Sequence, residues 1–337
     1  MAEKKLGYNI RIKAEKVNHE IFKEYLEIAK RADNAGLYFL AFPEFFGRFD
    51  RNRIHVVPYM AAIAARTEHV KLGTDVLQIP LLHPKHIADI GASLDIISEG
   101  RFILGAGVGM TVPAEFENFG IPMKERGRRT DEALDIIKKL WTEPAIYDYR
   151  GKFFTLRNVC SPPCIQKPHP PIWIGGMTDP SLRRTARYGN EWAGGMSWSV
   201  DTGIGGIPEE KWDVMERVEK LKQYCKESGR ELVFGREPKG PKEVGINQRI
   251  NININPDKEK ALEEARHFWT DVRKGRTQGG GSIEMKLRYA AVGNAEDVIE
   301  KLEEVYNTGA YLVTLYPLTT DSKSQWEMVE KEVLPSL

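Results

Sequence analysis

The chain has 337 residues, of which 41% are apolar, so it is long enough to bury a large core, and we expect one domain over residues 1–337. Its 49 basic and 48 acidic residues leave a net charge of +1, which gives no electrostatic footprint for nucleic acid or an anionic membrane and favours a small-molecule ligand. No apolar run predicts a membrane span, and three cysteines are too few for a disulfide framework, so we expect a cytoplasmic protein.

Strands and helices alternate along the whole chain. Predicted strands cover residues 6–12, 37–42, 70–77, 101–109, 171–176, 191–196, 244–254 and 310–316. Amphipathic helices are predicted over residues 20–35, 56–66, 83–100, 126–141, 182–188, 209–228, 257–274 and 295–306. Residues 147–156 are typical of a hairpin, and residues 197–242 are an insertion after the sixth strand. Eight strand–helix alternations in one chain predict a single (β/α)8 barrel of the TIM-barrel class.

The ends of three predicted strands are rich in glycine. Gly73 lies in the third strand, Gly107 and Gly109 end the fourth, and Gly175 and Gly176 end the fifth. In a parallel barrel these ends meet at one face, where glycine lets the backbone come close to a ligand. We therefore expect these glycines at one mouth of the barrel, although tight packing against a helix explains each of them equally well.

Several of these stretches together resemble the luciferase-like family of flavin- and deazaflavin-dependent oxidoreductases over nearly the whole chain. The resemblance is carried by the order and spacing of residues 72–77 (LGTDVL), 98–102 (SEGRF), 104–109 (LGAGVG), 126–132 (RGRRTDE) and 166–176 (QKPHPPIWIGG). It implies a barrel that binds a reduced flavin or deazaflavin at its carboxyl face, with hydride transfer or oxygen activation at the cofactor.

A flat isoalloxazine ring needs a strand deformed to approach its face and backbone amides at its polar edge. The residues expected to contact the ring are Gly73, Thr74, Asp75, Val76, Gly107 and Gly109. The resemblance implies a cis peptide between Asp75 and Val76, a bond that is rare without proline. An ordinary strand end, with Gly73 chosen for packing, is the alternative.

The phosphate-bearing tail of such a cofactor needs backbone N–H donors and cations. Gly175, Gly176 and Met177 precede a helix that begins near Pro180, so they are expected to form an anion site at its N-terminus. Arg183 and Arg184 follow on that helix, and at least one of them is expected on its solvated face. Deazaflavin-dependent relatives often place a phosphate-binding cation at the position that corresponds to Arg288.

The end of the second strand departs from the family pattern. Many luciferase-like enzymes have an acidic residue followed by His here, whereas this chain has Pro43-Glu44 followed by Phe45, as in a subset of deazaflavin-dependent relatives. Glu44, at an apolar strand end, is therefore the candidate catalytic acid or base. The alternative is a structural ion pair with Arg48 or Arg51. Met110 is a second departure, because some deazaflavin-dependent dehydrogenases carry an acid there.

We expect no metal site. His83 and His86 have a spacing that suits a metal ligand pair, but no third ligand is evident, and Cys160 and Cys164 lack a second pair. His83-Pro84 is more typical of a turn into a helix.

Three functional classes remain open. A coenzyme F420 (deazaflavin)-dependent oxidoreductase, in which Glu44 handles the proton, is favoured because of the Pro-Glu-aromatic pattern. An FMN-dependent monooxygenase that uses oxygen is the alternative, and a flavin-binding protein without catalysis is the third.

Family members usually pair through their second and third helices, so we also expect a homodimer through the small residues of 56–65. Residues 197–242 and 271–282 are expected to set the identity of the small-molecule substrate.

Overall fold

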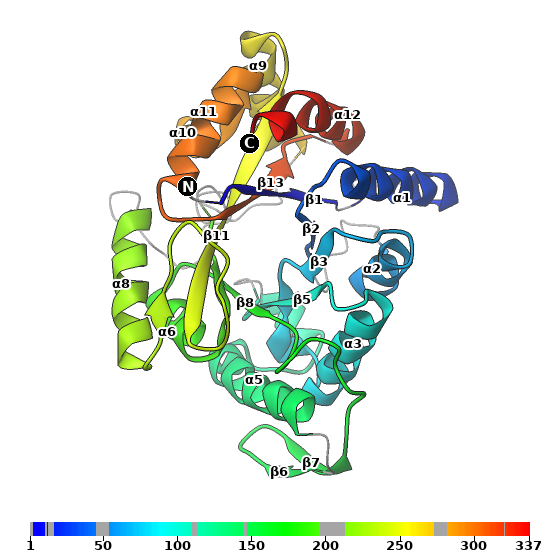
Figure 1. Ribbon diagram of the computed structural model, residues 1–337, viewed down its shortest axis with the longest axis vertical. Coiled ribbons are helices and arrows are strands. Elements are labelled where there is room, and N and C mark those ends of the chain that lie inside the picture. Colours follow the sequence, from blue (N-terminus) through cyan, green and yellow to red (C-terminus); the bar gives the residue numbers. More distant parts are fainter. Residues whose placement is uncertain are drawn as a thin grey trace.

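Eight parallel strands close into a barrel in the computed structural model, which describes residues 3–10, 12, 17–44, 54–109, 113–143, 147–195, 213–272, 282–319 and 321–337 (Figure 1). In order around the barrel they are β1 (Lys5–Asn9), β2 (Phe39–Phe42), β3 (Lys71–Thr74), β5 (Phe102–Gly107), β8 (Ile172–Gly175), β9 (Glu191–Ala193), β11 (Glu243–Ile254) and β13 (Leu312–Pro317). Pairing of β9 with β11 and of β13 with β1 closes the ring. The predicted (β/α)8 barrel is confirmed.

Helices surround the barrel in the expected order. They are α1 (His19–Asn34), α2 (Val56–Ala64), α3 (Pro84–Ile97), α5 (Arg126–Thr142), α6 (Asp179–Tyr188), α8 (Val214–Glu227), α9 (Lys258–His267), α11 (Ala295–Tyr306) and α12 (Ser322–Met328). Shorter elements are α4 (Pro113–Glu117), α10 (Ile283–Arg288) and three small strands, β4 (Leu77–Gln78), β10 (Glu231–Leu232) and β12 (Ala291–Gly293). The helix predicted over 257–274 is shorter than expected, because after His267 the chain continues as a π-helical turn over Phe268–Val272.

Helix ends follow the local chemistry of the sequence. Gly36 follows the C-cap of α1 with φ +79°, and Gly100 lies two residues after the C-cap Ser98 of α3 with φ +82°, so each predicted helix ends at a backbone conformation that favours glycine. At the start of α3, His83 Nδ1 accepts a hydrogen bond from the Lys85 N–H at 3.2 Å, so this histidine is a helix cap.

Aromatic side chains fill the barrel interior away from the carboxyl ends of the strands. The Phe39 and Trp173 rings lie 4.6 Å apart between centroids, and Ile103, Ala193 and Leu312 pack around them. Because these side chains pack closely across the barrel interior, we expect a ligand to enter from the carboxyl ends of the strands.

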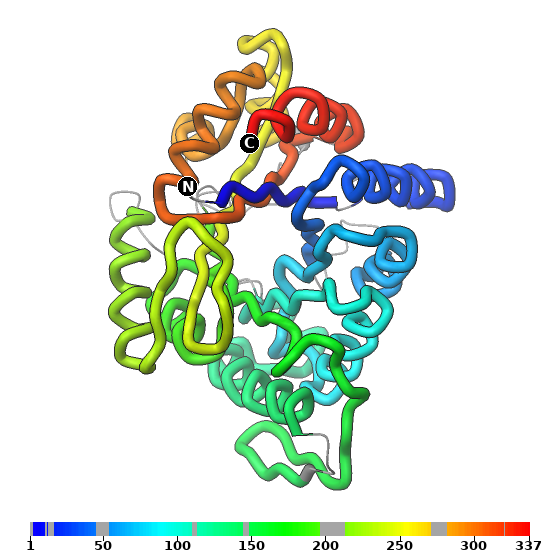
Figure 2. The backbone as a smooth tube through the Cα atoms, viewed as in Figure 1, coloured from blue at the N-terminus to red at the C-terminus, as the bar shows by residue number. Residues whose placement is uncertain are grey.

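The predicted hairpin is present, as β6 (Tyr147–Arg150) and β7 (Thr155–Val159), and it extends away from the barrel beside α5 (Figure 2). The Glu132 carboxylate on α5 accepts hydrogen bonds from the N–H groups of Lys152, Phe153 and Phe154 at 3.1, 3.0 and 2.9 Å. One carboxylate therefore fixes the loop of the hairpin to the barrel.

The insertion after the sixth strand is described from residue 213 onward, so the predicted start of its helix at residue 209 lies outside the described residues. Its helix α8 packs against α6, and β10 pairs with β11. Within the described parts of the chain, no helix combines the length and the apolar character needed to cross a membrane.

Candidate functional site

A cavity of about 610 Å³ opens at the carboxyl ends of the barrel strands. Its wall comes from segments that follow β2, β3, β5, β8 and β9, from the start of α5 and α6, and from Arg249 on β11. This volume is in the range of small-molecule and cofactor pockets. The cavity is thus the candidate site, at the face where barrels place their chemistry.

Most residues selected from the sequence line this one cavity. They are Glu44, Asp75, Val76, Gly107, Gly109, Gly175, Gly176 and Met177. Three others do not line it. Gly73 lies against the Phe39 ring, where an added Cβ would come within 2.8 Å of the ring, and the Thr74 hydroxyl donates to the Gly105 carbonyl at 2.8 Å. Arg288 is exposed at the end of α10.

Glycines on β5 and β8 make room for the turn after β3. A Cβ at Gly105 would lie 1.8 Å from the Thr74 carbonyl oxygen, and Cβ atoms at Gly107 and Gly175 would lie 2.5 and 2.9 Å from the Val76 methyl groups. The Asp75–Val76 peptide is cis, as the resemblance implies. These glycines let the half-buried Val76 side chain stand at the cavity wall.

Asp75, Arg249 and Tyr316 form a buried polar group at the base of the cavity. The Arg249 guanidinium forms an ion pair with Asp75, and the Tyr316 hydroxyl donates to the same carboxylate. Burial raises the pKa of Asp75, although the guanidinium and the hydroxyl both act to lower it.

Sequence reasoning did not select Arg249. A signal was present, because Asn247, Arg249 and Asn251 alternate with Ile250 and Ile252 along one strand. Polar residues at every second position of a barrel strand indicate a polar stripe on one face.

Cations and helix N-termini also contribute to the cavity wall. Gly176 has φ +124° and precedes α6, where Thr178 and Ser181 line the wall together with Arg184. Arg184 is buried, is held by Asp131 at 2.6 Å, and donates to the Gly127 carbonyl at 3.2 Å. This part of the wall offers backbone N–H groups and a fixed cation, which suits an anion.

The two arginines of α6 have different environments. Arg183 is 61% exposed and stacks over the Tyr224 ring at 3.9 Å, away from the residues that line the cavity. The expectation that at least one of them lies on the solvated face is confirmed for Arg183. Arg126, the first residue of α5, and Lys124, in the 3-10 turn Met123–Glu125 before it, add two further cations to the cavity wall, which sequence reasoning did not select.

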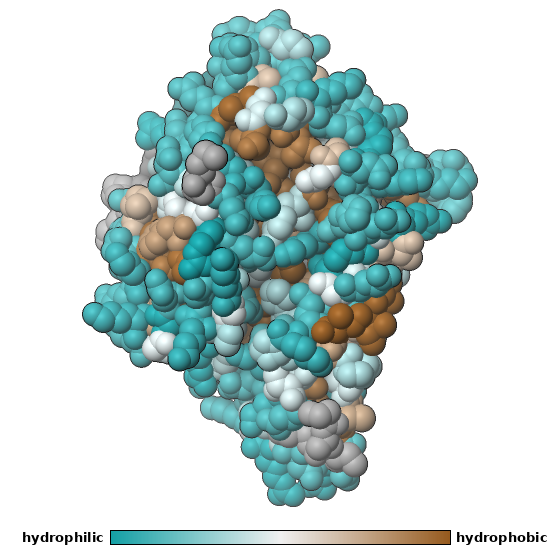
Figure 3. Space-filling view, in the orientation of Figure 1, coloured by the Kyte–Doolittle hydropathy of each residue, from teal (hydrophilic) through white to brown (hydrophobic). Residues whose placement is uncertain are grey.

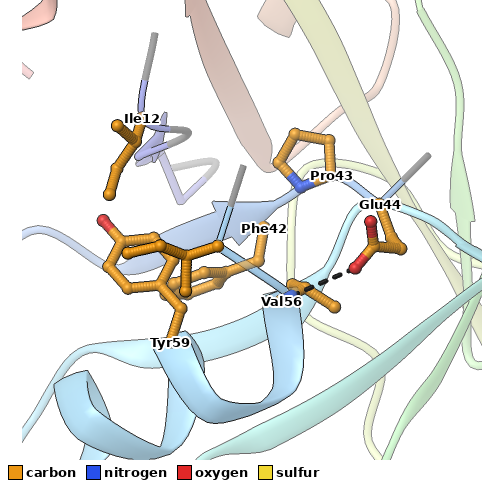
Figure 4. Close-up of a pocket in the computed structure, with 7 residues that line it drawn as sticks. Ile12, Phe42, Pro43, Glu44, Val56 and Tyr59 are labelled. Carbon is orange, nitrogen blue, oxygen red and sulfur yellow. Dashed lines mark hydrogen bonds between the residues drawn. The ribbon is translucent and has the colours of Figure 1, made fainter. Parts of the chain in front are cut away.

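Glu44 follows β2 and lies between the main cavity and a smaller one. Its carboxylate accepts a hydrogen bond from the Val56 N–H at 3.1 Å, at the N-terminus of α2 (Figure 4). The same carboxylate lies 4.0 Å from His55 Nδ1. The smaller cavity, of about 20 Å³, is lined by Phe42, Tyr59 and neighbouring apolar residues and has room for one water molecule. Arg48 and Arg51, the alternative partners of Glu44, lie outside the described residues.

The arrangement fits a flat ring with an anionic tail. Val76 offers an apolar surface that glycines leave uncovered, and the α6 N-terminus with Arg184 offers an anion site beside it. A side chain at Gly107 or Gly175 would clash with Val76. For a metal there is no comparable fit, because the described residues contain no group of three histidine, cysteine, aspartate or glutamate side chains suited to one.

Comparison with known proteins agrees with the family resemblance found in the sequence. A family model described as luciferase-like monooxygenase matches residues 6–312. The F420-dependent glucose-6-phosphate dehydrogenase of Gordonia bronchialis is 25% identical over 94% of this chain and 93% of its own length. The oxygenase component of the flavin-dependent trigonelline monooxygenase of Acinetobacter baylyi is 29% identical over 52% of this chain and 49% of its own length.

Among solved structures, the monooxygenase RslO1 from Streptomyces bottropensis superposes with a TM-score of 0.77. It is 23% identical, and the match covers 98% of this chain and 99% of that one. At this identity the likeness supports the barrel fold.

Proposed function

Because the chain belongs to the luciferase-like monooxygenase family, whose members are flavin- or deazaflavin-dependent oxidoreductases, we propose that it binds coenzyme F420 and transfers hydride to or from a small organic substrate. The observation that carries this proposal is the extent of positive charge along the cavity. Arg184, Lys124 and Arg126 all line it, Arg184 from α6 and the other two from the start of α5 and the turn before it. The tail of the deazaflavin is longer and more highly charged than the single phosphate of FMN, so it makes use of all three cations.

The residues of this chain have separate tasks in the proposed complex. Val76 supports one face of the ring, while Gly107 and Gly175 leave space for it. The amides at the start of α6, with Ser181 and Arg184, hold the phosphate. The bound cofactor supplies hydride chemistry, and the protein supplies position, exclusion of water and a proton.

Glu44 is the proposed proton carrier. It is 8% exposed, lines the cavity, and is held in place by the Val56 N–H. A carboxyl group fixed at the wall of a reaction cavity can give or take the proton that accompanies hydride transfer.

An FMN-dependent monooxygenase is the second candidate. It is supported by the 29% identity to the trigonelline monooxygenase component and by Arg184, since one fixed cation at a helix N-terminus is sufficient for one phosphate. The two candidates differ in what Lys124 and Arg126 contribute to cofactor affinity.

Parallel titration of the protein with FMN and with coenzyme F420, followed by fluorescence, tests the proposal. We expect F420 to bind more tightly, and the double substitution Lys124→Ala, Arg126→Ala to weaken F420 by about 10-fold or more, since charge-assisted hydrogen bonds contribute about 1.5–3 kcal/mol each. FMN affinity is expected to change little. The pair Arg183→Ala, Lys222→Ala removes the same charge from exposed sites and serves as the control. Tighter binding of FMN, or equal losses for both cofactors, would favour the monooxygenase.

A further inference from the structure

We propose that Arg249 binds the carbonyl oxygen of the substrate, and that the substrate or product of this protein is a neutral carbonyl compound. The inference rests on the proposed function for the presence of a cofactor ring, but its main observation concerns the guanidinium itself. Arg249 is about 94% buried, lines the cavity, and has Asp75 as its one partner among the described residues.

Most N–H donors of this guanidinium lack an acceptor. An arginine has five N–H donors, and Nη2 is the nitrogen that faces Asp75. Nε is enclosed without a hydrogen-bond partner in the described part of the chain. Nη1 makes no hydrogen bond with the described residues and is not among the enclosed atoms, so it is the nitrogen that can meet a ligand. The N–H groups of Nη1 are therefore able to donate to a ligand oxygen in the cavity, and hydrogen bonds from a charged donor are stronger than those from a neutral one.

The guanidinium is also fixed in place. Its partner Asp75 accepts from Tyr316 as well, so residues after β3, on β11 and on β13 hold one another at the base of the cavity. A donor that is already oriented loses little freedom when it binds a ligand oxygen.

The position of Arg249 beside the proposed cofactor site indicates which part of the substrate it contacts. A Cβ at Gly175 would contact both the Val76 methyl groups, at 2.9 Å, and Arg249 Nη2, at 3.5 Å. Arg249 is therefore adjacent to the residue proposed to support the ring. A carbonyl oxygen on Arg249 would bring the carbonyl carbon next to the ring, where hydride leaves or arrives.

The charges at this end of the cavity favour a neutral carbonyl group over a carboxylate. Asp75 offsets the charge of Arg249, and Glu44 adds a second carboxyl group to the same wall. The other cations that line the cavity, Lys124, Arg126 and Arg184, are those assigned to the cofactor tail in the proposed function. A carboxylate substrate would meet two acidic groups and one cation already in an ion pair.

Binding of three small probes tests the inference by ligand-observed NMR, with and without cofactor. Acetophenone carries a neutral carbonyl, benzoate a carboxylate, and ethylbenzene no oxygen. We expect the wild-type protein to bind acetophenone at least 10-fold more tightly than ethylbenzene and more tightly than benzoate. In Arg249→Met the preference for acetophenone over ethylbenzene should disappear, while Arg183→Met, an exposed arginine, should retain it.

The variants are chosen so that each failure can be recognised. Because Arg249→Met leaves Asp75 buried without its cation, the double variant Asp75→Asn, Arg249→Met is measured beside it, with the melting temperature of each. Equal binding of ethylbenzene and acetophenone, or tightest binding of benzoate, in the wild-type protein would overturn the inference without any variant. A parallel loss of F420 or FMN affinity in Arg249→Met would assign the residue to the cofactor instead. Failure of both cofactors to bind would refute the proposed function, while acetophenone binding to the cofactor-free protein would still report on Arg249.

Discussion

Two buried carboxyl groups lie at opposite ends of the barrel, and they differ in what surrounds them. Glu44, at the carboxyl end, lines the cavity and accepts from the Val56 N–H. Glu191, at the start of β9, accepts from the Tyr311 hydroxyl at 2.7 Å and from the Asn247 side-chain amide at 2.8 Å. Glu44 can therefore meet a ligand in the cavity, whereas the hydrogen-bond partners of Glu191 are two protein side chains.

Glu44→Gln should lower turnover by roughly 100-fold or more, because general acid–base groups typically contribute 10²–10⁴-fold. The glutamine carbonyl can still accept from the Val56 N–H, so cofactor affinity and melting temperature should change little. Turnover, cofactor titration and thermal unfolding of the same preparation check this. A structural glutamate would behave differently, because loss of one partner of a buried ion pair costs about 3–5 kcal/mol of stability. A large fall in melting temperature with a proportionate loss of activity would contradict the catalytic role.

The buried Glu191 carboxyl should make the free energy of unfolding depend on pH. Burial raises its pKa to about 7, against the effect of its two hydrogen-bond donors. In the native state Glu191 therefore keeps its proton up to a higher pH than in the unfolded chain, where the carboxyl has its ordinary pKa. The contribution of Glu191 to the free energy of unfolding is complete at low pH. As the pH rises toward 7, that contribution falls by an amount on the order of 3 kcal/mol.

Glu191→Gln, which cannot ionise, should remove this loss. Urea unfolding at pH 5 and pH 8 should show the variant gaining stability relative to wild type at pH 8, with little gain at pH 5. Glu231→Gln, an exposed carboxyl on the neighbouring β10, is the control. An unchanged pH profile in Glu191→Gln would show that this carboxyl is ionised in the native state.

At the scale of elements, the link between α5 and the β6–β7 hairpin depends on one carboxylate. Glu132 accepts from three backbone N–H groups of the loop, and a Cβ at Gly151 would lie 2.0 Å from its Oε1. Glu132→Ala and Gly151→Ala should each lower stability by about 1–3 kcal/mol and expose the hairpin to proteolysis. Because both changes break the same contact, the double variant should lose less than the sum of the two. Strict additivity in urea unfolding would contradict this, and Glu143→Ala, exposed at the end of α5, is the control.

At the scale of the whole molecule, the homodimer expected from the sequence remains a prediction. Apolar side chains gather on the side of the molecule that carries α2 and α3 (Figure 3). On α3, Ile96 and Ile97 are 44% and 45% exposed, while on α2 Ala61 and Ala62 are half-buried and Ala64 is buried. Contact through this side would cover exposed apolar surface at the end of α3.

Light scattering should give about twice the 38.3 kDa mass of the chain at micromolar concentration. Ile97→Lys should yield a folded monomer, because a buried unpaired charge opposes association. Met215→Lys, at an equally exposed position on α8, should leave the mass unchanged. The monomer mass for the wild-type protein would contradict the dimer.

Local sequence patterns were sufficient to predict the barrel and eight of the residues that line the cavity. Positive-φ glycines follow the ends of α1 and α3, at Gly36 and Gly100, and apolar runs mark buried parallel strands, so the element order could be predicted from local rules. The carboxyl ends of parallel strands must meet at one face, which is why Asp75, Gly107 and Gly175 were found together.

Which polar side chains share the cavity depends on long-range contacts that the sequence pattern does not reveal. Whether Arg183 or Arg184 turns inward depends on Asp131, 53 residues away on α5, and the pairing of Arg249 with Asp75 joins strands that lie far apart in the chain. Gly73 is a similar case. It packs against Phe39 inside the barrel, although its local sequence is equally compatible with a ligand contact. Such contacts depend on strand register and helix rotation, which no local pattern specifies.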